Sequence, residues 1–395
     1  MNIVIITNST SYEPRAEKAG AFFQRLGHRV LWLESDFFHR EKKKGREAKP
    51  DHIYIDTAPY KRNLSVSRLY SQYDFARKAG RVLEEQQADL LYVMLPANSL
   101  APVAAGIKEK FHVKLVFDVI DLWPESLPMK RIKGLWPVQC WRRLRDDHLA
   151  AADLVLTECR MYQDVLPAGK HDGENRGVMY WPKDKRAEKL EFIEDPECLH
   201  IVYLGSINHI IDMEMIAGLL EKIQRHEKLK LHIVGDGENR EAFLKLLKEK
   251  KIETEYYGAV YEEEKKREIF RRCSFGINIM KPDVCVGLTM KSIDYFCYGL
   301  PVINNIKGDT WQLVEEYGIG VNCQREDPGS AAKAVLKLAR EMREKGPGQI
   351  PGQECAQKQE QDKREKVREL YNRLFTVEAM ERVLAEKVLP LVEER

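Results

Sequence analysis

Short apolar runs with the length of buried strands alternate with amphipathic stretches along most of the chain. In the first half they predict strands at residues 3–7, 30–33, 52–55, 90–95, 113–119, 154–157 and 178–181. A helix over 16–26, ended by Gly27, separates the first two strands, as in a parallel β-α-β unit. The first half is therefore expected to form a doubly wound α/β domain.

The alternation stops at residues 184–198, which are charged and have prolines near both ends. This segment predicts an interdomain linker. Beyond it, strands are predicted at 200–204, 229–234, 253–257, 275–280, 302–304 and 320–322, with helices at 213–224, 240–249, 262–272 and 290–297. We expect two tandem α/β domains, over residues 1–183 and 199–375.

Two further segments fall outside this pattern. Residues 345–362 are rich in Gly, Pro and Gln, which predicts a surface excursion. Residues 376–395 predict an amphipathic helix capped by Thr376, with an apolar stripe at Val377, Met380, Leu384, Val388 and Leu391. Such a stripe needs a surface that buries it, and the N-terminal domain is a candidate.

Composition narrows the functional classes. The 395 residues carry a net charge of only +2, so no overall positive field marks a nucleic-acid-binding protein. The longest apolar runs are far below the roughly 20 residues that span a bilayer. The N-terminus lacks the pattern of a signal peptide, so we expect a cytoplasmic protein.

The sequence shows no familiar metal-binding pattern. None of the eight cysteines forms a C-x-x-C pair, no Asp-x-Asp follows a strand, and no histidine pair has ligand spacing. We therefore expect buried free thiols, no cofactor and an activity that does not depend on a metal ion.

Four segments of the second half carry a family resemblance: IVYLGSI at 201–207, LHIVGDG at 231–237, YGAV at 257–260 and GLTMKSIDYFCYGLPVI at 287–303. They resemble the donor-binding half of retaining, family-4-type GT-B glycosyltransferases. In the first half, DLWPE at 121–125 resembles a segment of bacterial transferases that build surface polysaccharides, and EPR at 13–15 is similar to the usual family opening. The resemblance implies two Rossmann-like domains facing each other across a cleft.

The same resemblance implies the activity. A sugar would pass from a nucleotide-sugar donor to a glycan or lipid-linked acceptor, with retention, in cell-surface polysaccharide synthesis. Two alternatives stay open: a sugar-nucleotide epimerase of the same fold, and a catalytically idle subunit that partners an active transferase.

The donor diphosphate is expected at the start of the helix over 290–297. A glycine there lets the backbone approach a ligand, and the positive end of the helix favours an anion. The resemblance places Asp294 at the ribose, and Lys291 either neutralises phosphate or lies exposed. The predicted donor-binding residues are Gly205, Ser206, Gly258, Val260, Gly287, Leu288, Thr289, Lys291 and Asp294.

One departure from the family concerns the phosphates. Relatives commonly follow the glycine at position 205 with an arginine and then a lysine that grip the diphosphate, and neither cation occurs here. Either Lys291, Arg15 or His209 compensates, or the enzyme is slow or inactive. The turn Gly235-Asp236-Gly237 is either a plain strand-to-helix connection or a donor contact.

Asp121 is the candidate catalytic residue of the first half. It follows a predicted strand, so we expect it to project towards the sugar, where a carboxylate could accept a proton or stabilise oxocarbenium character. The nearby Asp118 leaves the assignment open, because one of the two could orient the other or cap a helix. An aspartate before Trp-Pro is also a common turn residue.

Basic and aromatic residues gather after this segment, at Arg131, Lys133, Trp136, Trp141, Arg142, Arg143 and Arg145. Cations attract anionic lipid and tryptophan favours the interface, so this stretch predicts peripheral contact with the inner face of the membrane. The alternative is a solvated loop with a packed tryptophan.

Overall fold

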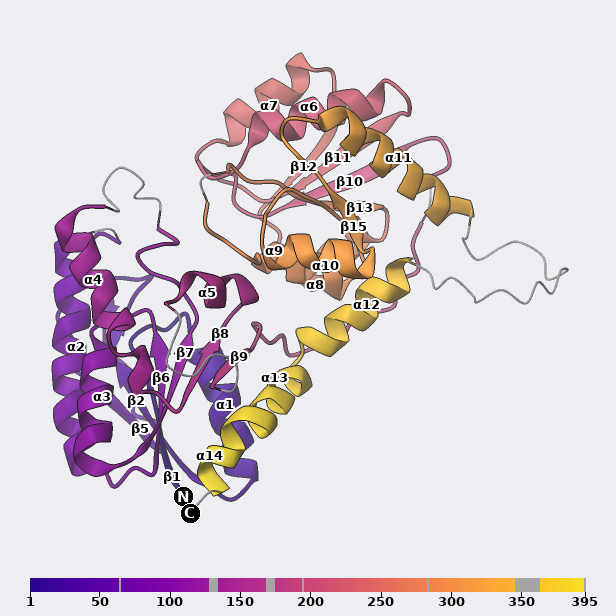
Figure 1. Ribbon diagram of the computed structural model, residues 1–395. Helices are drawn as coiled ribbons and strands as arrows, with labels where there is room; N and C mark the ends of the chain where they lie inside the picture. The colour runs from indigo at the N-terminus through magenta and orange to yellow at the C-terminus, as the bar shows by residue number, and fades with distance from the viewer. Residues whose placement is uncertain are drawn as a thin grey trace, which may run out of the picture. The chain divides into compact units, whose positions relative to one another are not determined.

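The computed structural model describes residues 1–63, 65–127, 134–167, 175–193, 195–282, 284–344 and 363–393. The chain divides into two compact units (Figure 1). Unit 1 comprises Met1–Lys183 together with Val377–Arg395, and unit 2 comprises Asp184–Thr376. The segment 345–362 lies outside the described residues.

Unit 1 is built on a parallel sheet with the strand order β5-β2-β1-β6-β7-β8-β9. Its strands are nearly continuous apolar runs, because helices cover both faces of a parallel sheet. The strands are β1 (Asn2–Thr7), β2 (Arg29–Ser35), β5 (His52–Ile55), β6 (Leu90–Leu95), β7 (Lys114–Val119), β8 (Leu154–Thr157) and β9 (Arg176–Val178). A short antiparallel pair, β3 (Phe37–Phe38) and β4 (Lys43–Lys44), stands beside them.

The helices of unit 1 connect these strands. They are α1 (Glu13–Arg25), α2 (Val66–Glu85), α3 (Leu100–Phe111), α4 (Trp136–Asp146), a 3-10 turn at Leu149–Ala151, and α5 (Arg160–Val165). Alternate residues of β1, such as Ile3 and Ile5, pack with Ala16 and Phe23 of α1 in one apolar core.

The C-terminal segment completes that core. It runs as α13 (Val377–Val383), a π-helical turn (Leu384–Val388) and α14 (Leu389–Glu393). Met380, Leu384, Val388 and Val392 are buried in the same core as α1. The predicted Leu391 is partly buried and packs against the same core, as expected. Val392 is buried as well, which the predicted stripe did not include.

Unit 2 repeats the architecture with the strand order β12-β11-β10-β13-β14-β15, all in parallel. Its strands are β10 (Leu199–Leu204), β11 (Leu229–Val234), β12 (Glu253–Gly258), β13 (Phe275–Asn278), β14 (Val302–Asn304) and β15 (Gly320–Asn322). The chain leaves β10 towards β11 on one side and later returns to β13 on the other. This switch point is where open α/β sheets bind ligands.

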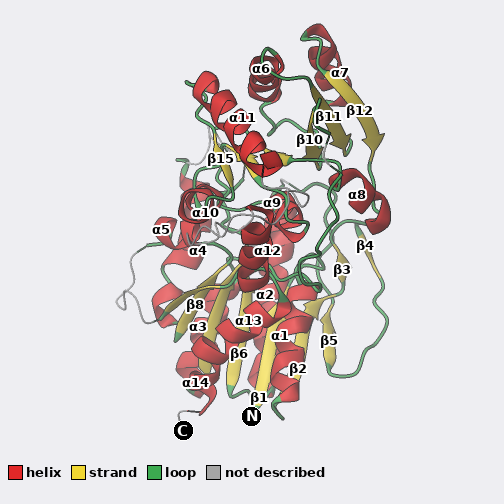
Figure 2. Cartoon of the chain, turned by 90° about the vertical axis from the view of Figure 1, so that its right-hand side faces the viewer, coloured by secondary structure: helices red, strands yellow, loops and turns green. Residues whose placement is uncertain are grey.

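The helices of unit 2 are α6 (Met213–Gln224), α7 (Arg240–Glu249), α8 (Glu263–Phe270), α9 (Met290–Cys297), α10 (Asp309–Tyr317), α11 (Pro328–Glu344) and α12 (Lys363–Leu374). Helices α6 and α11 lie side by side and share one apolar core with the sheet (Figure 2). Residues near 184–198, predicted as a linker, are held on unit 2 by an ion pair between Lys185 and Glu263 at 2.9 Å and by Tyr371, whose hydroxyl donates to the Lys185 carbonyl over 2.8 Å.

Candidate functional site

Two loops at the carboxyl ends of β10 and β11 are joined by their backbones. The N–H of Ile207 donates to the Asp236 carbonyl over 3.0 Å, and the Ile207 carbonyl accepts from the N–H of Asn239 over 3.0 Å. A Cβ atom on Gly235 would lie 1.9 Å from the Gly205 carbonyl oxygen. Gly235 is therefore required by the packing of these loops, and no ligand contact is needed to explain it.

The turn after β10 holds the predicted donor residues Gly205 and Ser206. Gly205 has a φ of 113°, a backbone conformation that other residues rarely adopt. Ser206 is exposed, and its carbonyl accepts a hydrogen bond from the Tyr203 hydroxyl over 2.8 Å. Both residues thus lie at the carboxyl edge of the sheet, in the turn after β10 at the switch point.

Helix α9 begins at the same edge and is anchored by polar side chains. The Thr289 hydroxyl caps the helix by accepting the N–H of Ser292 over 3.2 Å, and it donates to the Asn278 side chain over 3.0 Å. The preceding Gly287 carbonyl accepts the Thr310 N–H over 2.9 Å. These contacts fix the segment 287–289, including Leu288, ahead of the helix N-terminus.

Lys291 is the most informative side chain of this edge. It is 9% exposed, and its ammonium group lies 4.9 Å from the centre of the Tyr203 ring. Burial lowers the pKa of Lys291 to about 8. Among the residues that the structure describes, no hydrogen bond or ion pair is formed by its side chain. A desolvated cation with no counter-charge is costly, so this position favours binding of an anion.

Asp294 follows one turn later on α9 and is half-buried. Its negative charge is among the causes, after burial, that raise the pKa of Tyr371 on α12. It therefore lies near Tyr371. The ribose contact predicted for Asp294 stays a prediction.

The segment after β12 carries the residues predicted to face the base. Gly258 has a φ of 69°, and its carbonyl accepts the Gly235 N–H over 2.7 Å. Val260 lines a cavity of about 400 Å³ between this segment and α8, with Tyr257 and Ile269 among the other lining residues. The base contacts of Gly258 and Val260 stay predictions.

Three cations were considered as replacements for the missing arginine and lysine that bind the diphosphate in relatives. Two of them, Arg15 and His209, do not fit that role in this structure. Arg15 is buried in unit 1 and donates two hydrogen bonds to Asp118, of 2.8 and 2.9 Å, and two more to the backbone carbonyls of Met179 and Tyr180. His209 is exposed, and its ring lies 3.3 Å from a Glu238 carboxylate oxygen. Of the three, Lys291 alone is a buried cation that has no such partner among the described residues.

The ion pair between Arg15 and Asp118 distinguishes the roles of Asp118 and Asp121. Asp118 is fully buried, where it accepts from Arg15 and from the Tyr92 hydroxyl, so it is a structural residue. Asp121 is half-buried and accepts a hydrogen bond from Tyr12. Burial raises the pKa of Asp121, while the Tyr12 hydrogen bond and the charge of Arg68 lower it.

Comparison with known proteins bears on the fold and on the family of unit 2. Residues 199–341 match the family described as glycosyl transferases group 1. The chain has the GT-B fold. The resemblance to GT-B glycosyltransferases that the sequence predicted is therefore confirmed, together with the doubly wound α/β class.

The fold is supported over the full length of solved GT-B structures. The apo form of the lipopolysaccharide outer core galactosyltransferase WaaB has a TM-score of 0.67 at 15% identity, with 99% of each chain covered. Anabaena Alr3699/HepE in complex with UDP and glucose has a TM-score of 0.60 at 13% identity, with 98% of this chain and 99% of that chain covered. WaaG, a glycosyltransferase of lipopolysaccharide biosynthesis, has a TM-score of 0.60 at 12% identity, with both chains fully covered. No curated protein sequence matches the chain.

Only part of the basic and aromatic stretch predicted to face the membrane is exposed in the structure. Arg145 is buried and forms an ion pair with Glu125 at 2.8 Å, so its assignment to a membrane-facing surface was wrong. Trp141 is half-buried, and its ring centre lies 6.3 Å from that of Trp123. Arg131 and Lys133 lie outside the described residues.

The exposed part of that stretch adjoins an apolar surface that the sequence did not indicate. Trp136 is 77% exposed, and Arg142 and Arg143 follow it on α4. A largely apolar cavity of about 340 Å³ opens between α2 and α4. We use the name α2–α4 patch for four exposed apolar residues at the starts of these two helices, Val66, Tyr70, Leu135 and Trp136, of which Val66 lines the cavity. Among the described residues, no helix is long and apolar enough to cross a bilayer.

Sequence reasoning missed two tyrosines, one beside the candidate residues of each unit. Tyr203 lies within a buried strand and reads as an ordinary core residue, yet it links Lys291 to the turn at Ser206. Tyr12 stands just before α1 and supplies the hydrogen bond to Asp121 from more than a hundred residues away. No local pattern marks either residue, because each contact joins segments that are distant in sequence.

Proposed function

We propose that the chain is a glycosyltransferase that binds a nucleotide-sugar donor at the carboxyl edge of the unit 2 sheet. The sugar passes to a glycan or lipid-linked acceptor, with retention and without a metal ion. The observation that carries this proposal is Lys291, a buried ammonium group with no anionic partner in the described part of unit 2, at the first turn of α9.

A donor diphosphate supplies the missing counter-charge. Its oxygens would accept from the Lys291 ammonium and from backbone N–H groups at the start of α9, where the helix dipole is positive. The group that leaves with the electrons of the glycosidic bond is the nucleoside diphosphate. A preorganised cation at that position is typically worth about 10²–10³ in rate. Lys291 thus takes over the role for which relatives use the cations after the first strand.

The solved structures of similar fold guide the choice of nucleotide base in the donor. HepE is described in complexes with UDP, with UDP and glucose, and with UDP-glucose. A uridine donor is therefore our first choice for this chain. Gly258 and Val260 would face the base, and Asp294 the ribose.

Unit 1 contributes Asp121 to the reaction. Its half-buried carboxylate, held by Tyr12, accepts the proton of the acceptor hydroxyl or stabilises positive charge on the sugar in the transition state. Asp118 cannot take this role, because Arg15 and Tyr92 already occupy its oxygens.

A lipid-linked acceptor would be met at the membrane surface. The exposed Trp136 and Leu135 beside Arg142 and Arg143 combine apolar and cationic groups as peripheral membrane proteins do. We place this contact on the cytoplasmic face, where nucleotide sugars are available.

A thermal-shift panel of UDP-, GDP-, ADP- and CMP-sugars tests the donor site. A ligand at 100 times its Kd stabilises the folded state by about 2.7 kcal/mol. We expect one nucleotide class to raise the melting temperature of the wild type and of a control, Lys337→Met, whose side chain on α11 is 80% exposed. The same ligand should leave Lys291→Met unchanged.

The remaining outcomes separate the alternatives. If no nucleotide sugar stabilises the wild type, the donor site is refuted and an idle subunit becomes the better explanation. Donor binding followed by conversion of the sugar nucleotide without any acceptor would instead identify an epimerase. Transfer to an acceptor with an inverted anomeric centre would refute retention alone.

A further inference from the structure

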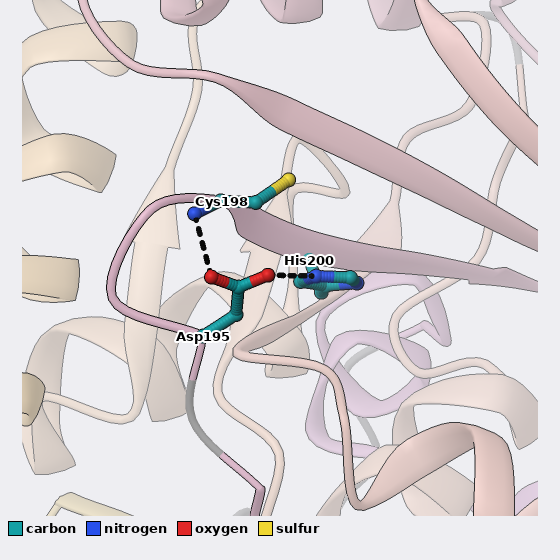
Figure 3. A group of neighbouring side chains, drawn as sticks. All are labelled: Asp195, Cys198 and His200. Atoms are coloured by element: carbon teal, nitrogen blue, oxygen red, sulfur yellow. Dashed lines mark hydrogen bonds and ion pairs between the residues drawn. The ribbon is translucent and has the colours of Figure 1, made fainter.

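Three potential metal ligands meet at the amino end of β10, the opposite end of the strand from the turn at Gly205. Asp195, Cys198 and His200 each offer one ligand atom, and these atoms all lie within 4.8 Å of one another. Figure 3 shows the Asp195 carboxylate directed at the backbone N–H of Cys198 and at the His200 ring, with the Cys198 sulfur beside them. The sequence spacing is Asp-x-x-Cys-x-His.

A chain of side chains crosses the sheet from this cluster. His200 Nδ1 lies 2.7 Å from His232 Nε2, and His232 Nδ1 lies 2.8 Å from the Tyr257 hydroxyl. Glu255, which forms an ion pair with Lys230 at 2.8 Å, lies near Tyr257. The two imidazole rings are stacked, with centres 5.1 Å apart.

One ring nitrogen of His200 faces Asp195. His200 Nδ1 faces His232, which is 1% exposed, and His200 Nε2 lies 3.3 Å from an Asp195 oxygen. Nε2 is therefore the ring nitrogen that is placed to bind an ion together with Asp195.

The thiol of Cys198 lies at the same point. Cys198 is 6% exposed, and its sulfur lies within 4.8 Å of the ligand atoms of Asp195 and His200. A carboxylate, a thiol and an imidazole thus offer three ligand atoms around one point.

We propose that Asp195, Cys198 and His200 bind a divalent transition-metal ion of the zinc class. Oxygen, sulfur and imidazole nitrogen together are a ligand set typical of zinc. Ligand atoms around a tetrahedral zinc lie about 3.3–3.8 Å apart, so the three atoms here need only small movements. The Asp195 side chain is 43% exposed, which leaves an entry path and a fourth position for water.

Second-shell contacts support the same assignment. The N–H of a metal-bound histidine is usually held by a hydrogen-bond partner that fixes its tautomer, as His232 does for His200. The bound ion would fasten the segment before β10 to the sheet and would displace the proton of Cys198. This site lies apart from Lys291 and α9, so it leaves metal-independent transfer at the donor site untouched.

Cobalt titration of the full-length, chelator-treated protein tests the site. We expect one Co²⁺ per chain with a cobalt–thiolate charge-transfer band that Zn²⁺ abolishes. Cys198→Ser should remove the band, whereas Cys140→Ser, which removes an exposed thiol on α4, should keep it. Tyr257→Phe, which breaks the chain of hydrogen bonds, should weaken Zn²⁺ binding about 10–100-fold.

Several outcomes of the metal titration would overturn the proposed site. Absence of stoichiometric Co²⁺ and Zn²⁺ binding by the wild type would overturn the proposal, and so would a band that survives in Cys198→Ser. If Cys198→Ser does not fold, Asp195→Asn decides, since its side chain is largely exposed and its loss should weaken Zn²⁺ binding more than Tyr257→Phe does. Unchanged Zn²⁺ affinity in Asp195→Asn would show that Asp195 is not a ligand and would overturn the three-residue site.

Discussion

The ammonium group of Lys291 lies over the ring of Tyr203, 4.9 Å from its centre. A desolvated cation over an aromatic face is attracted by about 2 kcal/mol, which offsets only part of the cost of burying it. The Tyr203 hydroxyl donates to the carbonyl of Ser206 and so joins the lysine to the turn after β10. The pair therefore holds a positive charge ready beside a turn at the switch point of the sheet.

Replacing this charge should change stability and ligand binding in opposite directions. Lys291→Met keeps the stem of the side chain and removes an unpaired buried cation, so we expect unit 2 to become more stable without ligand, by about 1–3 kcal/mol. Stabilisation by UDP or a UDP-sugar should be lost. Thermal melts with and without nucleotide measure both effects, and a fall in the stability of the free protein would contradict our view of Lys291.

The lowered pKa of Lys291 also predicts how stability depends on pH. Its pKa is about 8 in the folded protein against an ordinary value of 10.5, so the folded state binds fewer protons between these values. Stability should therefore rise with pH across this window, by about 3 kcal/mol in total. Urea unfolding of wild type and Lys291→Met at pH 7 and pH 10 isolates the effect, since other groups contribute equally to both. A difference between the two proteins that does not change with pH would rule it out.

The sheet of each unit could be predicted because its signal is local. Apolar runs such as Leu90–Leu95 and Leu154–Thr157 are strands with the predicted bounds, and α6, α7 and α9 also match. The strand predicted at 178–181 lies at Arg176–Val178 instead, and α10 and α12 were not predicted. Helix α12 is highly charged, and two of its buried residues, Arg364 and Arg368, are arginines, so its apolar pattern is weak.

The site was predictable only where a motif is continuous in the sequence. The segment 287–291 lies at a helix start as expected, because a glycine, a capping threonine and an apolar helix follow one another. The burial of Arg15 was missed, since its partner Asp118 is a hundred residues away. Likewise, Asp195, Cys198 and His200 show no established metal motif, and their hydrogen-bond partner His232 comes from another strand.

Gly235 should be intolerant of any side chain. An alanine Cβ would lie 1.9 Å from the Gly205 carbonyl oxygen, and φ at this position is 152°. We expect Gly235→Ala to destabilise the protein by about 3 kcal/mol or more, through steric and backbone strain. Gly218→Ala on α6 is the matched control, since nothing lies within 4 Å of its Cβ and helix propensity favours alanine by about 1 kcal/mol. Similar unfolding midpoints for the two variants would show that the loops separate readily.

The carboxylate of Asp121 should control the acidic limb of the pH–rate profile. As a base it must be ionised, so activity falls as the pH drops through its raised pKa. Tyr12 stabilises the ionised form by a hydrogen bond, and Tyr12→Phe should therefore move this limb to higher pH. Asp121→Asn should lower kcat by about 10²–10⁴ while the affinity for nucleotide stays the same.

Tyr92→Phe is the matched control for the Tyr12 experiment. It also removes a tyrosine hydroxyl from an aspartate, but that aspartate is Asp118, which Arg15 holds inside unit 1. The control should lose some stability and leave the acidic limb in place. An acidic limb that shifts equally in both variants would mean that Asp121 is not the titrating base.

The α2–α4 patch predicts membrane binding that depends on both apolar and basic side chains. Trp136→Ala should weaken binding to vesicles containing anionic lipid. The indole is 77% exposed in the free protein, and insertion into the membrane interface would remove it from water. Arg143→Gln should cost about 1 kcal/mol of binding, an effect that disappears at high salt or with neutral lipid. Tyr261→Ala is the control, since this 87% exposed aromatic lies on unit 2, outside the patch. Co-sedimentation that falls equally for Trp136→Ala and Tyr261→Ala would indicate unspecific adsorption, and binding unchanged in Trp136→Ala would exclude the patch as the contact surface.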